Sequence, residues 1–174
     1  MAIKQRTLRW AVTSILAIIT FAVLAWLDTK LKSETGYGTL ALQSAGTAED
    51  VNRILFAWRV QQHTAMAGFS LGFDYLFMPL WGFGLYYGAL AARDAFAPKM
   101  LFRIFTLLAA VPLAGAIFDA IENTLEFSML MGQPSDHIAS LAVTASTVKS
   151  LCFFVGLALW VLGLLGLLRR KKEA

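Results

Sequence analysis

The chain has 174 residues, of which 58% are hydrophobic and 15% are charged, and its formal net charge is +4. Soluble domains average roughly 45 to 50% apolar and about 25% charged residues, so this composition indicates a membrane protein. The length allows a few spanning helices in a single integral membrane domain (residues 1–174) and no separate catalytic domain. The net charge does not predict nucleic-acid binding, because the basic residues gather at the ends of apolar segments.

The first apolar segment covers residues 10–27 and follows a basic start. Signal peptides also begin with basic residues, but their apolar region is only roughly 7 to 15 residues long. The sequence Ala25-Trp26-Leu27-Asp28 is also a poor cleavage site. We therefore predict that the segment is an uncleaved first span.

Residues 28–64 form a predicted external loop that contains an amphipathic helix. Thr47 is a candidate N-cap, and acidic residues follow it in the first turn. Apolar residues then repeat at helical spacing, at Val51, Ile54, Leu55 and Trp58. This helix is expected either to lie on the outer membrane surface or to continue into the next span. The lack of a glycine or proline between Trp58 and Ala67 favours continuation.

Three further apolar segments are each longer than the roughly 20 residues needed to cross a membrane. They cover residues 65–92, 104–131 and 138–168. Together with the first span, they predict an all-α fold. We expect a polytopic membrane protein with a bundle of four transmembrane helices, in which the external amphipathic helix precedes the second span.

Most of the basic residues fall on one side of this arrangement. They are Lys4, Arg6, Arg9, Arg93, Lys99, Arg103, Arg169, Arg170, Lys171 and Lys172. Because short loops rich in lysine and arginine stay in the cytoplasm, both chain termini are expected there. The pattern favours a multi-pass protein of a bacterial inner membrane.

Several polar residues lie inside the apolar segments. They are Asp74, Asp119, Glu122, Asn123, Glu126 and Lys149. A charge at the centre of a bilayer costs roughly 2.5 to 3.5 kcal/mol on insertion scales, so such residues usually pair or serve a function. Counted along each helix from its cytoplasmic end, the first three acids and the lysine all lie at a depth of roughly 22 to 28 Å. We therefore predict one polar layer toward the outer side of the membrane.

Helical spacing predicts which way these side chains face. Asp119, Glu122, Asn123 and Glu126 are separated by three, four and seven residues, so they share one face of the third span. Asp74 in the second span and Lys149 in the fourth each lie on the helix face that also carries residues suited to the interior of a bundle. Those residues include the secondary site candidates His63, Ser70, Trp81 and Ser146. Pro79 frees the carbonyl of residue 75 and is expected to kink the second span.

The predicted layer holds more carboxylates than lysines. We expect one carboxyl to carry a proton, or a cation to supply the missing charge. This favours a protein that binds or transports a proton, a cation or a small cationic or amphipathic ligand from the outer side. The alternatives are a lipid-modifying enzyme that uses acid–base chemistry and a structural or accessory subunit of a larger membrane complex.

Enzyme motifs for nucleophilic, nucleotide-dependent or zinc-dependent chemistry are absent from the sequence, so its enzymatic status stays open and a non-enzymatic role is favoured. No metal or cofactor is predicted. The expected partners are the lipid bilayer, a small ligand or lipid, and a second copy or another membrane subunit. In its predicted span number, size and intramembrane acids, the chain resembles the EXPERA group of sterol isomerases and sigma-2-type receptors, in architecture only. No site residue is transferred from that group.

Overall fold

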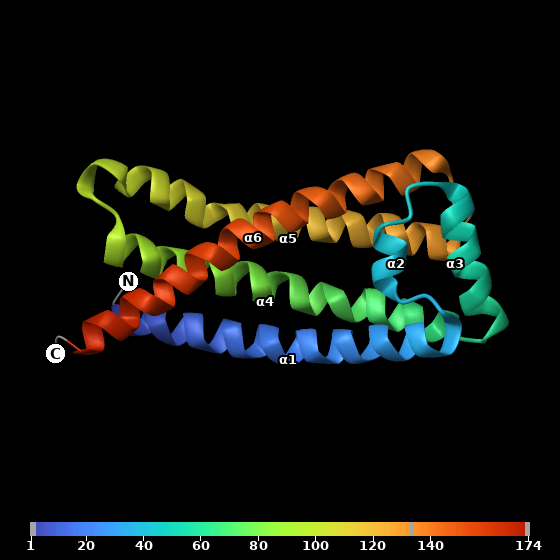
Figure 1. The fold of residues 1–174 in the computed structure, drawn as a ribbon, viewed down its shortest axis with the longest axis horizontal. Helices are drawn as coiled ribbons and strands as arrows, with labels where there is room; N and C mark the ends of the chain where they lie inside the picture. The colour runs from blue at the N-terminus through green and yellow to red at the C-terminus, as the bar shows by residue number, and fades with distance from the viewer. Residues whose placement is uncertain (1–2, 133, 173–174) are drawn as a thin grey trace. The chain divides into compact units, whose positions relative to one another are not determined.

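The computed structural model describes residues 3–132 and 134–172, and these residues form helices and short connections without a strand. In chain order the elements are α1 (Ile3–Thr35), α2 (Thr39–Gln43), α3 (Ala48–Val60), α4 (Thr64–Phe96), the 3₁₀ helix η1 (Lys99–Leu101), α5 (Phe102–Met131) and α6 (Asp136–Lys172) (Figure 1). The side chains of Lys4, Arg170, Lys171 and Lys172, which contributed to the predicted orientation, lie outside the described part of the chain.

Three stretches of helix in the described residues are long and apolar enough to cross a membrane. They are Gln5–Thr35, Lys99–Met131 and Asp136–Arg169. These three support an all-helical membrane protein. Helix α4 has 33 residues and is not among these three stretches. Asp74, Pro79, several glycines and three tyrosines dilute its apolar residues, so the four-span prediction is met only in part.

The chain divides into two compact units. Unit 1 consists of residues 1–18, 79–117 and 149–174, and unit 2 consists of residues 19–78 and 118–148. Each unit contains one part of each of the four long helices. Unit 2 also contains α2 and α3, and unit 1 contains η1.

Unit 2 has the larger hydrophobic core. Its buried members include Leu31, Leu42, Val51, Leu55, Trp58, Leu71, Met129 and Ala142. Trp58 is fully buried in α3, and its indole Nε1 donates a hydrogen bond to the Tyr37 carbonyl, 2.7 Å away. This bond anchors α3 to the segment that follows α1, and both lie at the same end of unit 2 in Figure 1.

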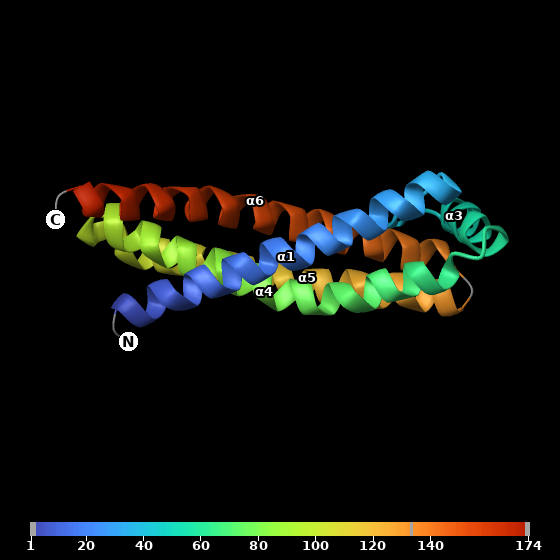
Figure 2. The ribbon, with the colours of Figure 1, turned by 90° about the horizontal axis from the view of Figure 1, so that it is seen from below.

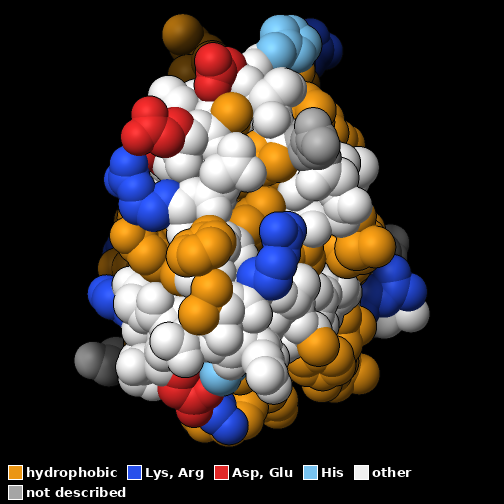
Figure 3. Space-filling model, turned by 90° about the vertical axis from the view of Figure 1, so that its right-hand side faces the viewer, with side chains coloured by type: hydrophobic (Ala, Val, Ile, Leu, Met, Phe, Trp, Pro, Cys, Tyr) orange, Lys and Arg blue, Asp and Glu red, His pale blue; other side chains and the backbone are white. Residues whose placement is uncertain are grey.

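Helix α3 forms as its sequence predicts. Thr47 is the N-cap, and its side chain accepts a hydrogen bond from the Asp50 backbone N–H at 3.2 Å. The predicted apolar face is buried, while the opposite face carries Arg53, which pairs with Glu49 and Asp50. Acidic, basic and hydrophobic side chains are therefore intermixed on the exposed surface at this end (Figure 3).

The prediction that α3 continues into α4 is wrong. Helix α3 ends at Val60, and Gln62 adopts a left-handed conformation with φ of 59°. The Gln62 N–H donates to the Arg59 carbonyl at 3.1 Å, and the His63 N–H donates to the Trp58 carbonyl at 2.7 Å. This pair of bonds is a Schellman motif, which usually has glycine at the left-handed position. Here glutamine takes that position, so the sequence shows no breaker.

The helix that contains the predicted first span, residues 10–27, extends beyond that span at both ends. Helix α1 continues to Thr35 and is one uninterrupted helix in Figure 2. Asp28, which the sequence placed at the start of a loop, lies inside the helix. Its Oδ1 accepts hydrogen bonds from the Thr39 hydroxyl at 2.8 Å and the Leu40 backbone N–H at 3.1 Å. Asp28 therefore provides a hydrogen-bond acceptor for the first turn of α2, a helix that the sequence did not predict.

In unit 1 the helices approach one another at glycines. A Cβ at Gly163 of α6 would lie 2.2 Å from the carbonyl oxygen of Gly88 in α4, and a Cβ at Gly88 would lie 2.5 Å from Trp160. A Cβ at Gly156 would likewise meet Pro112 of α5. The small residues thus allow close packing of α4, α5 and α6 within this unit.

Candidate functional site

The acidic face of α5 is buried in unit 2. The exposed fraction is 3% for Asp119, 1% for Glu122, 1% for Asn123 and 0% for Glu126. Their spacing of three, four and seven residues places them on one side of a helix, and the burial shows that this side faces the interior. The three carboxyl groups lie along about 10 Å of helix axis.

Two hydrogen bonds join this part of α5 to α4. The Asn123 amide donates to the Leu71 carbonyl at 2.7 Å, and the Tyr75 and Thr124 hydroxyls lie 2.7 Å apart. The amide of Asn123 therefore has a structural partner, which places α4 beside the acidic face of α5.

Asp74 of α4 lies at the level of Asp119 of α5. Three residues before Leu71 in α4, a Cβ at Gly68 would contact Leu130, which is seven residues after Asn123 in α5, so the two helices are antiparallel. Asp74 is three residues beyond Leu71, and Asp119 is four residues before Asn123. Along the helix axes, Asp74 and Asp119 therefore lie about 4 to 6 Å from the Leu71–Asn123 bond, in the same direction. Asp74 is half-buried in this position.

The predicted lysine belongs to the other unit. Lys149 is the first residue of the α6 part of unit 1, whereas the acids belong to unit 2. It is half-buried and continues the buried face of α6 that carries Ala142 and Ala145. Asp74, Asp119, Glu122, Glu126 and Lys149 all interact with other groups of the protein. The predicted pairing of this lysine with the acids stays a prediction.

The secondary candidates are dispersed. Ser70 is buried on α4, one turn before Asp74, and Ser146 is half-buried on α6. Trp81 lies in unit 1, where its ring meets the Phe153 ring edge-on at a centroid distance of 5.4 Å. His63 lies in the turn before α4, about 16 Å of helical rise from Asp74, and contacts the Glu34 carboxylate and the Gln61 carbonyl. It is therefore a link between α1 and this turn.

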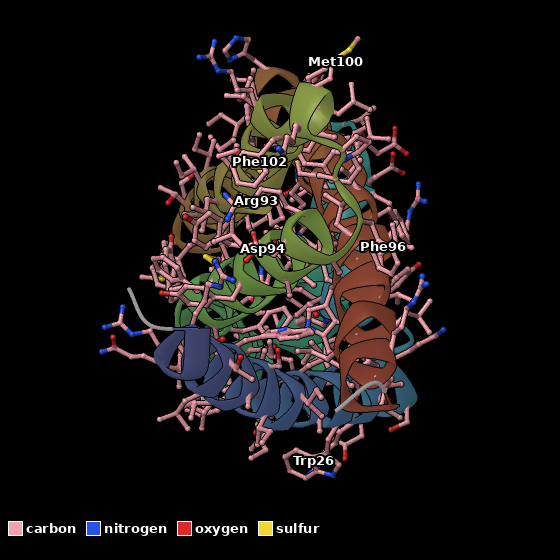
Figure 4. The ribbon with its side chains drawn as sticks, turned by 90° about the vertical axis from the view of Figure 1, so that its left-hand side faces the viewer. Trp26, Arg93, Asp94, Phe96, Met100 and Phe102 are labelled. Atoms are coloured by element: carbon pink, nitrogen blue, oxygen red, sulfur yellow. The ribbon has the colours of Figure 1, made fainter. Side chains whose placement is uncertain are left out.

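Sequence reasoning missed a group of charged residues in unit 1. Asp94 accepts hydrogen bonds from Arg6 of α1 and from Arg93, whose Nε and Nη2 lie 2.9 and 2.7 Å from Asp94 Oδ1. Figure 4 shows Arg93 and Asp94 together, with Phe102 beside them, and the guanidinium of Arg93 lies 4.4 Å from the Phe102 ring centroid. Arg6 and Asp94 are 88 residues apart, so no local pattern indicated the contact.

Among the residues that the structure describes, no three histidine, cysteine, aspartate or glutamate side chains form a group able to share a metal ion. No family model, curated protein or solved structure matches the chain. What the protein does is therefore inferred from its own residues.

Proposed function

We propose that this multi-pass membrane protein binds a proton or a small cation at the carboxyl groups of α5. The observation that carries the proposal is the burial of Asp119, Glu122 and Glu126 on one face of a helix apolar enough to cross a membrane. Ionised groups are expensive in such a setting, and intramembrane acids commonly belong to proton or ion pathways.

The spacing of the acids supports a positively charged ligand. Glu122 and Glu126 are neighbours at i and i+4, and Asp119 and Glu122 are neighbours at i and i+3. Like charges at these spacings repel each other, so a proton or a cation near them relieves the repulsion. Asp74 on α4 adds a fourth carboxyl at the level of Asp119.

The proposal includes α4 as a fourth span. Its 33 residues exceed the roughly 20 that cross a membrane, and in unit 2 it is bonded to α5 through Asn123. In that arrangement the acids lie toward the outer side, both termini lie in the cytoplasm, and the membrane is a bacterial inner membrane. A spanning helix can contain an aspartate such as Asp74 and several glycines where it faces other helices.

The proton itself is the best first probe, since it requires no knowledge of the ligand. Purified protein in lipid nanodiscs is titrated between about pH 4 and pH 10 while the carbonyl stretch of protonated carboxyl groups is followed by infrared difference spectroscopy. Carboxyls shielded from water absorb at a different frequency from those in water. We expect such a band to appear on acidification, and we expect Glu122→Gln or Glu126→Gln to remove part of it.

A matched variant at an exposed acid controls for charge alone. Glu49 lies on α3 with its side chain 85% exposed, so Glu49→Gln removes the same charge outside the buried face. It is expected to leave the shielded band unchanged. Repeating the titration in sodium and in a bulky organic cation separates proton binding from cation binding. A wild-type protein without a shielded band and without a cation effect would show that the acids serve only to hold helices together.

A further inference from the structure

Unit 1 contains a small pocket that is separate from the acids of α5. It is lined by α1, α4 and α6, with Arg6, Thr7, Trp10, Tyr87, Asp94 and Gly166 among its residues. Its volume is about 20 Å³, which is room for roughly one water molecule or one oxygen atom of a larger ligand. The lining is unusual for an apolar helix bundle, because it combines several hydrogen-bond donors with one carboxylate.

Beside this pocket lies a charged group of Arg6, Arg93 and Asp94, of which Arg6 and Asp94 line the pocket itself. Arg93 already makes two hydrogen bonds to Asp94 through Nε and Nη2, and its Nη1 donates to the Thr106 hydroxyl at 3.2 Å. Arg6 adds a second guanidinium to the same carboxylate through one nitrogen, Nη2. Two arginines on one aspartate leave a net charge of +1. A guanidinium has five N–H donors, so Arg6 retains donors for an additional acceptor.

One of the lining residues, Trp10, has an indole N–H that lacks an acceptor. Trp10 is 5% exposed, and its Nε1 is buried without a hydrogen-bond partner in the described part of the chain. The adjacent Trp160, which meets Trp10 edge-on, differs because its Nε1 donates to the Ser14 hydroxyl at 3.1 Å. A buried tryptophan N–H normally has a partner, so Trp10 calls for an acceptor that belongs to a ligand or solvent.

We propose that this pocket takes one oxygen of the phosphate group of an anionic membrane lipid, with the rest of the phosphate outside the pocket. A phosphate oxygen in the pocket accepts hydrogen bonds from Trp10 Nε1 and from Arg6, and the net positive charge selects an anion. Arg6 and Trp10 lie at the start of the apolar helix Gln5–Thr35, which is the level of the lipid headgroups if this helix crosses the membrane. The lipid's acyl chains would then lie along the exposed apolar side chains of α1. This proposal is independent of the proposed function of α5.

The test measures binding of phosphatidylglycerol to the full-length protein in detergent by native mass spectrometry. Phosphatidylcholine serves as a lipid whose phosphate is balanced by its own ammonium group, and inorganic phosphate is the third probe. We expect selective retention of phosphatidylglycerol. Arg6→Gln removes one charge-assisted hydrogen bond and is expected to weaken this binding about tenfold. Asp94 keeps both bonds to Arg93 in this variant, so the fold should persist.

Matched controls distinguish the pocket from general charge attraction. Arg103 is exposed in the same unit, and Arg103→Gln is expected to leave binding within twofold of the wild type. Trp10→Phe keeps an aromatic ring but removes the N–H, so it should weaken binding, whereas Trp26→Phe at an exposed tryptophan should not. Asp94→Asn removes the competing carboxylate and is expected to preserve or strengthen binding.

Each other result contradicts the proposal. Equal losses in Arg6→Gln and Arg103→Gln would indicate attraction to surface charge only. Equal retention of both lipids, or unchanged binding in both Arg6→Gln and Trp10→Phe, would show that the pocket does not take a lipid phosphate. Binding of inorganic phosphate without lipid selectivity would make the free anion the ligand. If Arg6→Gln fails to fold, the comparison of Trp10→Phe with Trp26→Phe decides the outcome.

Discussion

At the scale of single residues, Gln62 determines how α3 ends. Its φ of 59° lies in the left-handed region, which costs an L-residue roughly 1 to 2 kcal/mol relative to a right-handed conformation. Glycine adopts this conformation without the clash of a Cβ. We therefore expect Gln62→Gly to increase the free energy of unfolding by about 0.5 to 1 kcal/mol, measured as thermal or denaturant stability in detergent micelles.

The neighbouring glutamine is the matched control for this prediction. Gln61 is the C-cap of α3 with φ of −86°, so it has no left-handed strain to relieve. Gln61→Gly is expected to lower stability slightly, because glycine makes the unfolded chain more flexible. Similar losses of stability in both variants would mean that α3 and α4 form one continuous helix in the membrane.

Residue spacing predicted more of the α5 site than of its surroundings. The offsets between Asp119, Glu122, Asn123 and Glu126 were enough to place them on one face, and burial of that face follows from the cost of exposing it to lipid. The bond from Asn123 to the Leu71 carbonyl depends on the register of two helices, which spacing within one helix does not determine. The same limit explains why the contact of Arg6 with Asp94 was missed.

At the scale of elements, the close contact of α4 and α6 in unit 1 depends on Gly163 and Gly88. A methyl group at Gly163 would meet backbone atoms of Gly88, which have little freedom to move. We expect Gly163→Ala to lower the free energy of unfolding by about 1 to 3 kcal/mol, the usual cost of overpacking. The measurement is the temperature at which half of the heated protein is lost from its monodisperse peak in size-exclusion chromatography.

A second glycine in α4 controls for the change in helix propensity. A Cβ at Gly72 would have no neighbour within 4 Å, so Gly72→Ala adds a methyl group without a clash. It should leave the midpoint unchanged or raise it, because alanine favours a helix more than glycine does. A Gly163→Ala protein as stable as the Gly72→Ala protein would contradict the close packing of the two helices.

The bounds of some helices could be predicted from their own residues, and those of others could not. Helix α3 carries its own cap and apolar periodicity, so its start at residue 48 and its buried face were predicted. Helix α2 has five residues and depends on Asp28 of α1 for hydrogen bonds, so its own sequence gave no signal. Helix α1 passes residue 28 because that aspartate is bonded to the following turn, whereas the apolar pattern alone suggested an end.

At the scale of the whole molecule, the number of spans fixes the sides of the membrane on which the termini lie. If only the three most apolar stretches cross, α4 stays on the outer side and the termini are on opposite sides. Arg93, Lys99 and Arg103 would then lie outside, and so would the basic residues after residue 168. If α4 also crosses, these residues all lie on the same side as Arg6 and Arg9. The positive-inside rule therefore favours four spans.

Cysteine labelling distinguishes the two arrangements. In a Cys152→Ala background, a single cysteine replaces either Met100, which is 90% exposed in η1 (Figure 4), or His137, which is exposed at the start of α6. Spheroplasts of an expressing bacterium are treated with a membrane-impermeant maleimide before and after permeabilisation. With four spans we expect Met100→Cys to react only after permeabilisation and His137→Cys to react in intact spheroplasts.

The three-span arrangement predicts the reverse pattern for both positions. In that case α5 begins outside, so Met100→Cys would react at once, and the short connection from α5 to α6 would be protected in the cytoplasm. In each arrangement one cysteine is labelled in intact spheroplasts and the other is labelled only after permeabilisation. A cysteine that reacts poorly in both conditions is therefore not mistaken for a protected one. The reverse pattern would also remove Asp74 from the membrane and leave the acids of α5 at the cytoplasmic side. A proton or cation would then reach them from inside the cell.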